Sequence, residues 1–147
     1  MEVMKIMEKL NVYLSNLAVW NVKLHNLHWN VVGVQFVALH NFTEELYDDV
    51  FQKYDDVAEH IKMNGGEPLA KLSDYLDKTT IKELSQTSYK TQEVLNHLKE
   101  DLELMNALAV EIRNEADEKG DFVAVALFEE HVAFYNKQLW FIGSMQK

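Results

Sequence analysis

The sequence predicts an all-α protein, a four-helix bundle with a short extra helix in its long middle connection. Three observations support this prediction. Apolar residues recur at alternating spacings of three and four along most of the chain, strong stop signals divide that pattern, and no stretch alternates as a half-buried strand does. At 147 residues the chain has the size of one domain, so we expect a single domain over residues 1–147.

The first two helices are predicted from two apolar stripes that Gly33 separates. The first stripe consists of Val3, Ile6, Leu10, Tyr13, Leu17, Trp20, Leu24 and Leu27. The second stripe consists of Leu39, Phe42, Leu46, Val50, Val57 and Ile61. It ends at the run Asn64-Gly65-Gly66-Glu67-Pro68, because two glycines followed by proline stop a helix.

The second half of the chain begins with a mixed stretch from about Leu69 to Lys82, with a short helix expected around Leu69–Leu76. The third helix is predicted from Leu84, Val94, Leu98, Leu102, Met105, Ala109, Ile112 and Ala116. At Lys119-Gly120-Asp121 a glycine can end this helix and an aspartate can cap the next one. The fourth helix is predicted from Phe122, Val125, Val132, Leu139 and Ile142. The first and third joints are short and link antiparallel neighbours, whereas the longer middle connection allows a crossover.

Composition excludes several classes of function. The chain has no cysteine, which excludes disulfides, thiolate metal sites and cysteine nucleophiles. Its net charge of −10 argues against a DNA-binding surface, and it suits either a protein that handles cations or simple solubility. There is no signal-peptide pattern and no apolar run near the roughly 20 residues that span a bilayer. We therefore expect a cytoplasmic protein without a membrane partner.

Five potential metal ligands lie in and near the second predicted helix: His28, His40, Glu44, Asp55 and Glu59. Imidazole and carboxylate together suit iron and other first-row divalent metals. His40 and Glu44 are four residues apart and share a helix face, and the same holds for Asp55 and Glu59. Either pair alone is more often a solvated face than a site, so the interpretation depends on how the pairs relate.

Helix geometry predicts that the two pairs meet only across two chains. His40 and Asp55 are 15 residues apart, which is about 22 Å along a helix. One metal ion with bonds near 2 Å cannot bind both ends. Each residue turns the helix by about 100°, so after 15 residues the side chain again points within roughly 60° of its starting direction. Both pairs therefore face nearly the same side of the helix. A two-fold axis near Asp49 and Val50 would bring the pairs of two chains together into two equivalent intersubunit sites, with His28 beside His40.

A metal site inside one bundle is not predicted. Such sites use Glu-x-x-His pairs, and no histidine here has glutamate three residues before it. The remaining histidines are not predicted to be main metal ligands. We expect His25 to support the site or an interface, and His97 and His131 to be surface or interface residues. Trp20 and Trp140 are expected in core or intersubunit packing.

The residues named above resemble the signature of the Dps family of ferritin-like proteins. The matching run is His28-Trp29-Asn30-Val31-Val32-Gly33-Val34-Gln35-Phe36, followed by Leu39-His40, Glu44, Asp55 and Ala58-Glu59. The segments Gly65-Gly66-x-Pro68 and residues 116–121 also resemble the family, so the likeness covers nearly the whole chain. Two positions differ: Glu44 stands where the family often has aspartate, and His60 stands where it commonly has arginine.

The resemblance implies a hollow dodecamer with ferroxidase sites at its two-fold interfaces. Members of the family oxidise Fe²⁺, typically with hydrogen peroxide, and store the ferric product, which serves iron homeostasis and protection from oxidative stress. It implies that His28 and His40 ligate from one subunit and Asp55 and Glu59 from its partner. Direct ligation by Glu44, ligation through water, and no ligation all stay open. The resemblance also implies that Trp29 donates an electron in peroxide chemistry.

Two other functions were weighed against iron oxidation. Some members of the family coat DNA through a lysine-rich terminal extension, but this chain shows no such run and is strongly acidic. Direct DNA binding is therefore not expected. A shell without catalysis is also disfavoured, because all five ligand-type residues are present.

Overall fold

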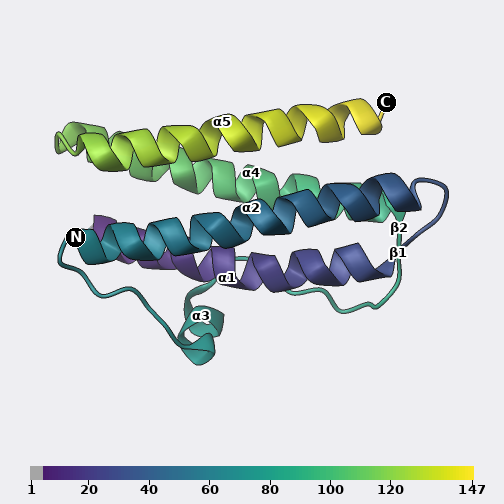
Figure 1. Cartoon of the computed structure of the whole chain (residues 1–147), viewed down its shortest axis with the longest axis horizontal. Helices are drawn as coiled ribbons and strands as arrows, with labels where there is room; N and C mark the ends of the chain where they lie inside the picture. Colours follow the sequence, from purple (N-terminus) through teal and green to yellow (C-terminus); the bar gives the residue numbers. More distant parts are fainter. Residues whose placement is uncertain (1–4) are drawn as a thin grey trace.

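Four long helices lie side by side along the molecule, and a short helix lies outside them (Figure 1). The structure is a computed structural model that describes residues 5–147. The long helices are α1 (Ile6–Asn30), α2 (Phe36–Met63), α4 (Thr91–Glu118) and α5 (Phe122–Met145). They confirm the all-α fold class and the four predicted helices. Val3, the first residue of the predicted stripe, lies outside the described residues.

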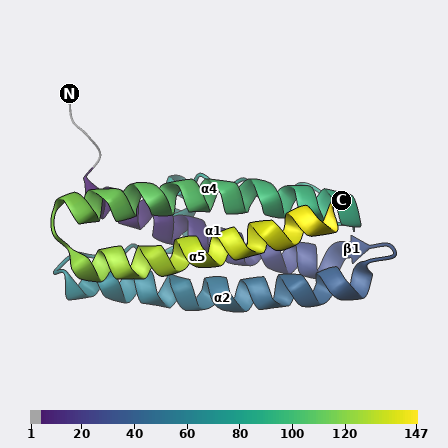
Figure 2. The same cartoon turned by 90° about the horizontal axis from the view of Figure 1, so that it is seen from above.

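The bundle consists of two helical hairpins, because α1 packs along α2 and α4 packs along α5 (Figure 2). The apolar stripes that predicted the helices form the core between them. Leu17 and Leu24 of α1, Leu46 of α2 and Leu102 of α4 are all buried. Burial of each such side chain contributes roughly 1.5–3 kcal/mol, so the stripes hold the four helices together.

Two glycine turns end helices as predicted. At the end of α2, Gly65 has a φ of 79°, and the Gly66 N–H donates to the Ile61 carbonyl at 3.0 Å, which is the bond of a Schellman motif. At the end of α4, Gly120 has a φ of 71°, and the Asp121 N–H donates to the Ala116 carbonyl at 3.0 Å. The Asp121 carboxylate then accepts the Ala124 N–H at 3.1 Å and caps α5, as predicted.

The middle connection carries the chain from one end of the bundle to the other, so α2 and α4 run in the same direction (Figure 1). Its helix α3 (Leu72–Lys78) confirms the predicted extra helix, although it begins and ends slightly later than expected. Buried Asn16 of α1 holds the connection, because its carboxamide accepts the Thr80 N–H at 2.7 Å and donates to the Thr80 hydroxyl at 2.9 Å.

Two details of this connection differ from the prediction. Leu84 precedes α4, which begins only at Thr91, so its assignment to the third helix was wrong. Two short strands, β1 (Val31–Val32) and β2 (Tyr89–Lys90), pair in parallel just before α2 and α4. A strand of two residues is too short to produce an alternating pattern, which is why the sequence did not reveal it. Among residues 5–147, no helix has the length and apolar content that crossing a bilayer requires.

Candidate metal centre

Three of the five predicted ligands meet where α1 ends and α2 begins. His28 lies in the last turn of α1, and His40 and Glu44 lie in the first turns of α2. One ligand atom from each residue lies within 4.8 Å of the others. The short joint at Gly33, whose φ is 119°, lets α2 fold back so that the histidines of two helices meet.

Each histidine is held by the backbone of the other. The His28 Nδ1–H donates to the His40 carbonyl at 2.6 Å, and the His40 Nδ1–H donates to the His28 carbonyl at 2.9 Å. A carbonyl oxygen can only accept, so both Nδ1 atoms carry the proton and both Nε2 lone pairs are free. The two rings stack with centroids 3.7 Å apart. This is the tautomer and orientation that a metal-ligating imidazole needs.

The surroundings of His28 favour its neutral form. His28 is only 5% exposed, and this burial lowers its pKa. The hydrogen bond to the His40 backbone and the charge of Glu44 oppose the lowering of the pKa without reversing it. The carboxylate of Glu44 is exposed, with Oε1 3.9 Å from the Nε2 of His28. A neutral imidazole is the form that binds metal, so His28 is ready to ligate without first losing a proton.

The other two predicted ligands lie in a second group toward the far end of α2. Asp55 and Glu59 each offer an oxygen within 4.8 Å of the other and of Asp56. Asp56 was left out of the predicted site, although its spacing of three from Glu59 could have revealed it. Its carboxylate also accepts from the Gln52 side-chain amide at 3.0 Å.

The structure keeps these two groups apart within one chain, as the helical rise requires. They lie about 22 Å apart along α2 and face nearly the same side of it. Phe51 lies between them, within roughly 20° of the direction of His40, and is 63% exposed. Phe51 is therefore an exposed apolar side chain between the two groups of candidate ligands.

Val50 and Asp49 mark the level of the predicted two-fold axis, and neither presents a free side chain on the exposed face of α2. Val50 is fully buried in the bundle, and Asp49 pairs with buried Lys53, so neither side chain is at the centre of this face. A side chain lies near a two-fold axis only if it points toward the partner helix, and its position along the helix alone does not ensure this. Asp48, Phe51 and Gln52 are exposed at that level.

Aromatic residues surround the histidine end of this face. Trp29 is 68% exposed, with its ring 5.7 Å from that of His25. His25 donates from Nδ1 to the Asn21 carbonyl at 2.7 Å and stacks on Tyr47 at 3.8 Å, outside the ligand group. Tyr47 in turn contacts the His28 ring edge-on at 5.1 Å. Tyr47 was not among the predicted site residues, although its spacing of three from Glu44 could have revealed it.

The remaining histidines are not ligand candidates. His131 was expected at a surface or interface, and that expectation was wrong: it is buried, and its Nδ1 lies 2.8 Å from the Tyr13 hydroxyl. His60 is buried as well, and its Nε2 accepts from the Asn64 amide at 3.0 Å. His97 is half-buried, with its ring edge-on to Tyr89.

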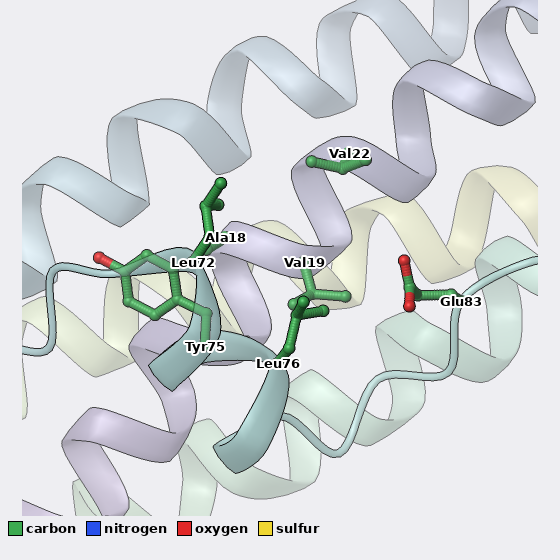
Figure 3. Close-up of a pocket in the computed structure, with 7 residues that line it drawn as sticks. All are labelled: Ala18, Val19, Val22, Leu72, Tyr75, Leu76 and Glu83. Atoms are coloured by element: carbon green, nitrogen blue, oxygen red, sulfur yellow. The ribbon is translucent and has the colours of Figure 1, made fainter.

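One of several concave features elsewhere on the described chain is an apolar groove between α1 and α3. Figure 3 shows Val19 and Val22 of α1 facing Leu72 and Leu76 of α3 across it. Glu83 is the one charged residue of its lining. The groove lacks the paired polar groups that catalysis or metal binding would require, so the two ligand groups of α2 are the better site candidates.

Comparisons with known proteins identify the family of this chain. Residues 7–147 match the family model of the ferritin-like domain. The DNA protection during starvation protein of Helicobacter pylori is 33% identical over 139 residues, which are 95% of this chain and 96% of that protein.

Solved structures resemble the chain along almost its whole length. The match to the crystal structure of Helicobacter cinaedi CAIP includes 97% of this chain and 100% of the CAIP chain, with 34% sequence identity and a TM-score of 0.94. The Dps protein of Vibrio cholerae O1, described as a member of a broad superfamily of ferritin-like diiron-carboxylate proteins, is 28% identical over 97% of this chain and 89% of its own, with a TM-score of 0.92. The chain therefore belongs to the Dps family of ferritin-like proteins.

Proposed function

We propose that this protein is a ferroxidase and iron-storage protein whose metal sites are shared between two copies of the chain. The observation that carries the proposal is the separation of the candidate ligands into two groups along α2. At one end of α2, His40 and the neighbouring His28 of α1 present free Nε2 atoms, and three carboxylates lie toward the other end. Imidazole with carboxylate is a donor set that suits Fe²⁺.

A two-fold axis is the simplest way to complete such sites. An antiparallel copy of α2 places the histidine end of one chain against the carboxylate end of the other, and symmetry repeats the site. Exposed Phe51 lies in the contact near the axis. Each pair of chains then holds two equivalent sites, and neither chain can close a site alone.

Within each site the residues have distinct roles. His28 and His40 bind Fe²⁺ through Nε2, while Asp55 and Glu59 of the other copy supply negative charge that favours the ferric product. Asp56 lies close enough to join them. Glu44 lies beside His28 and is placed to bind either directly or through water.

The reaction that we propose uses hydrogen peroxide, with dioxygen as the other candidate oxidant. Two ferrous ions give up one electron each, the O–O bond of one peroxide breaks, and its oxygens are reduced to hydroxide. Hydrolysis of the ferric ions releases protons and yields the stored ferric mineral. Trp29, exposed beside His25 and near the histidine half-site, is placed to give up an electron when the oxidant takes only one.

The assembly that we propose is a hollow homododecamer in the cytoplasm that stores ferric iron. Removal of Fe²⁺ and peroxide would protect the cell from oxidative damage. The net charge of −10 favours uptake of cations into such a shell.

Direct DNA binding is the alternative function, because relatives carry the name DNA protection during starvation protein. The acidic chain argues against it, since binding to DNA draws mainly on lysine and arginine contacts to phosphates. A mobility shift of plasmid DNA at moderate salt would support this alternative. No shift, together with peroxide-driven iron oxidation, would support the ferroxidase.

Complementation between two inactive variants tests the shared site. His28→Ala with His40→Ala removes one half, and Asp55→Ala with Glu59→Ala removes the other. Subunits of the two variants that are dissociated, mixed and reassembled should regain about a quarter of the wild-type sites, because half of the random pairs are mixed and each mixed pair has one intact site.

The matched control is a mixture of His28→Ala chains with His40→Ala chains, which damages the same half in both. This mixture should regain no more activity than its components. Recovery in the control, or none in the test mixture despite reassembly, would contradict the shared site.

A further inference from the structure

A second cluster of titratable side chains lies inside the bundle, away from both ligand groups. Tyr13 of α1 and His131 and Tyr135 of α5 are buried there, with Lys53 of α2 beside them. Polar groups in a core are costly unless they are paired, so their concentration at one place calls for an explanation.

The three aromatic side chains form one hydrogen-bonded chain. The Tyr13 hydroxyl lies 2.8 Å from His131 Nδ1 and 2.5 Å from the Tyr135 hydroxyl. Burial lowers the pKa of His131 to about 3, and Lys53 adds to this, so the imidazole is neutral. If Tyr135 donates to Tyr13 and Tyr13 donates to Nδ1, each hydroxyl proton has an acceptor. The opposite direction would leave the Tyr135 proton with none among the hydrogen bonds of residues 5–147.

This arrangement permits one kind of chemistry. Burial raises the pKa of both tyrosines, so neither ionises at neutral pH. A phenol in this state gives up an electron readily only if its proton leaves at the same time. Tyr13 has an acceptor for that proton, the Nδ1 of His131, and Tyr135 donates a hydrogen bond that would stabilise the radical oxygen left behind.

We propose that Tyr13 is a redox-active residue that supplies an electron to one-electron oxidants formed at the iron site, with His131 as its proton acceptor. The inference rests on the proposed ferroxidase function. When Fe²⁺ gives one electron to hydrogen peroxide, hydroxide and a hydroxyl radical result. The radical takes one electron and becomes hydroxide. Tyr13 supplies that electron, its proton moves to His131, and a neutral tyrosyl radical and an imidazolium remain.

Trp20 is the relay between the two regions. It lies eight residues before His28 on α1, about 12 Å along the axis, and its ring is 6.1 Å from that of Tyr135. Its indole N–H is buried and has no hydrogen-bond partner in the described part of the chain. Oxidised Trp20 therefore cannot pass its proton to a neighbour, stays strongly oxidising, and takes an electron from the tyrosine pair.

The imidazole of His131 decides which tyrosine keeps the radical. The Lys53 ammonium lies 5.6 Å from the centre of the Tyr135 ring, but Asp49 pairs with it, and the Asp49 carboxylate raises the pKa of Tyr13 and Tyr135 alike. Of the two tyrosines, only Tyr13 is hydrogen-bonded to the imidazole, so the radical forms there. The complete burial of Tyr13 keeps water and other radicals away.

Electron paramagnetic resonance of the assembled protein tests the proposal in two arms. In the first, photogenerated tris(bipyridine)ruthenium(III) oxidises the metal-free protein. In the second, Fe²⁺ and hydrogen peroxide are added while iron oxidation is followed by absorbance. We expect a tyrosyl signal in both arms that Tyr13→Phe reduces at least tenfold.

Tyr89→Phe is the matched control, since Tyr89 is equally buried but donates to the Gln86 carbonyl instead of to a histidine. It should leave the signal unchanged. His131→Leu keeps Tyr13 but removes the acceptor, and should abolish the signal and its solvent isotope effect. Melting temperatures verify that each variant folds.

The outcomes separate this proposal from the ferroxidase. If iron is not oxidised at all, the proposed function fails and the ruthenium arm alone decides whether Tyr13 is redox-active. If iron is oxidised normally but no Tyr13-dependent signal forms in that arm, the proposal is overturned. A signal that persists in Tyr13→Phe overturns it as well.

Discussion

The two histidine sites of this molecule use the same side chain in opposite ways. At the end of α1, the Nδ1–H of His28 donates to a backbone carbonyl, and its Nε2 faces the surface beside exposed Glu44. In the middle of the bundle, the Nδ1 of His131 faces a buried tyrosine hydroxyl. The first imidazole can bind a cation from solution, whereas the second can only exchange protons with its neighbours.

The hydrogen-bond partner of Nδ1 therefore determines whether a histidine can bind metal or only exchange a proton. A carbonyl partner fixes the proton on Nδ1 and frees Nε2 as a ligand. A phenol partner can supply a proton to Nδ1, which leaves the imidazole without a role in metal binding. Four predictions test this contrast.

The largest effect is expected from the double variant His28→Ala with His40→Ala. Removing both nitrogen ligands should lower the rate of peroxide-driven iron oxidation at least about 100-fold, because loss of even one supporting partner of a ligand typically costs 10–100-fold. Stopped-flow absorbance after Fe²⁺ addition measures the rate. In contrast, His131→Gln should bind Fe²⁺ as tightly as the wild type. Weakened Fe²⁺ binding in His131→Gln would show that the two regions are not separate.

The second prediction concerns acid stability, which should depend on His131. Its folded pKa of about 3 lies below the ordinary value of 6.5, so the unfolded state takes up the proton first. The stability that the neutral ring contributes is complete above pH 6.5 and is lost as the pH falls toward 3. At pH 5 the loss relative to pH 7 should be about 2 kcal/mol.

Guanidinium unfolding at equal protein concentration measures this difference. His131→Gln should remove that share of the pH dependence, whereas His97→Gln, in which a half-buried ring is replaced, should retain it. An unchanged pH dependence in His131→Gln would mean that other groups cause the loss of stability.

The third prediction concerns the Lys53–Asp49 ion pair beside the buried cluster. Asp49→Ala leaves the lysine, which is 6% exposed, without its partner and should cost about 1–3 kcal/mol. Lys53→Met removes the buried charge and should change stability by less than about 1 kcal/mol. Thermal and guanidinium unfolding measure the loss in free energy of unfolding for both variants. A larger loss for Lys53→Met than for Asp49→Ala would show that the unpaired buried lysine is not the more destabilising state.

The smallest effect is expected from Thr43→Val at the metal end. The Thr43 hydroxyl lies 3.2 Å from His28 Nδ1 and donates to the Leu39 carbonyl at 2.8 Å, while the His40 carbonyl is the closer partner of His28. Losing the hydroxyl should therefore weaken metal binding only a few-fold. Zinc titration by calorimetry measures the affinity, and a loss of more than about tenfold would show that Thr43, rather than the carbonyl, orients the ring.

Local patterns were sufficient to predict the helices and the two groups of candidate ligands. The three-and-four spacing from Leu10 to Leu27, and the glycine turns at Gly65 and Gly120, depend on neighbours close in sequence. The histidine and carboxylate groups on α2 followed from helical spacing and from the family signature.

Contacts between distant residues could not be predicted in this way. His131 meets Tyr13 across 118 positions of sequence, and no local spacing reveals such a pair. The pairing of Val31 with Tyr89 likewise depends on where the long connection returns the chain. The proposed partner half of each metal site belongs to another copy, so only helix geometry and symmetry could suggest it.

Anomalous scattering from crystals soaked in Zn²⁺ or Fe²⁺ tests whether two chains share each metal site. We expect a peak bonded to the Nε2 atoms of His28 and His40 in one copy and to Asp55 and Glu59 of a two-fold-related copy. A peak whose ligands all come from one chain, or peaks absent from both α2 groups at saturating metal, would contradict the claim.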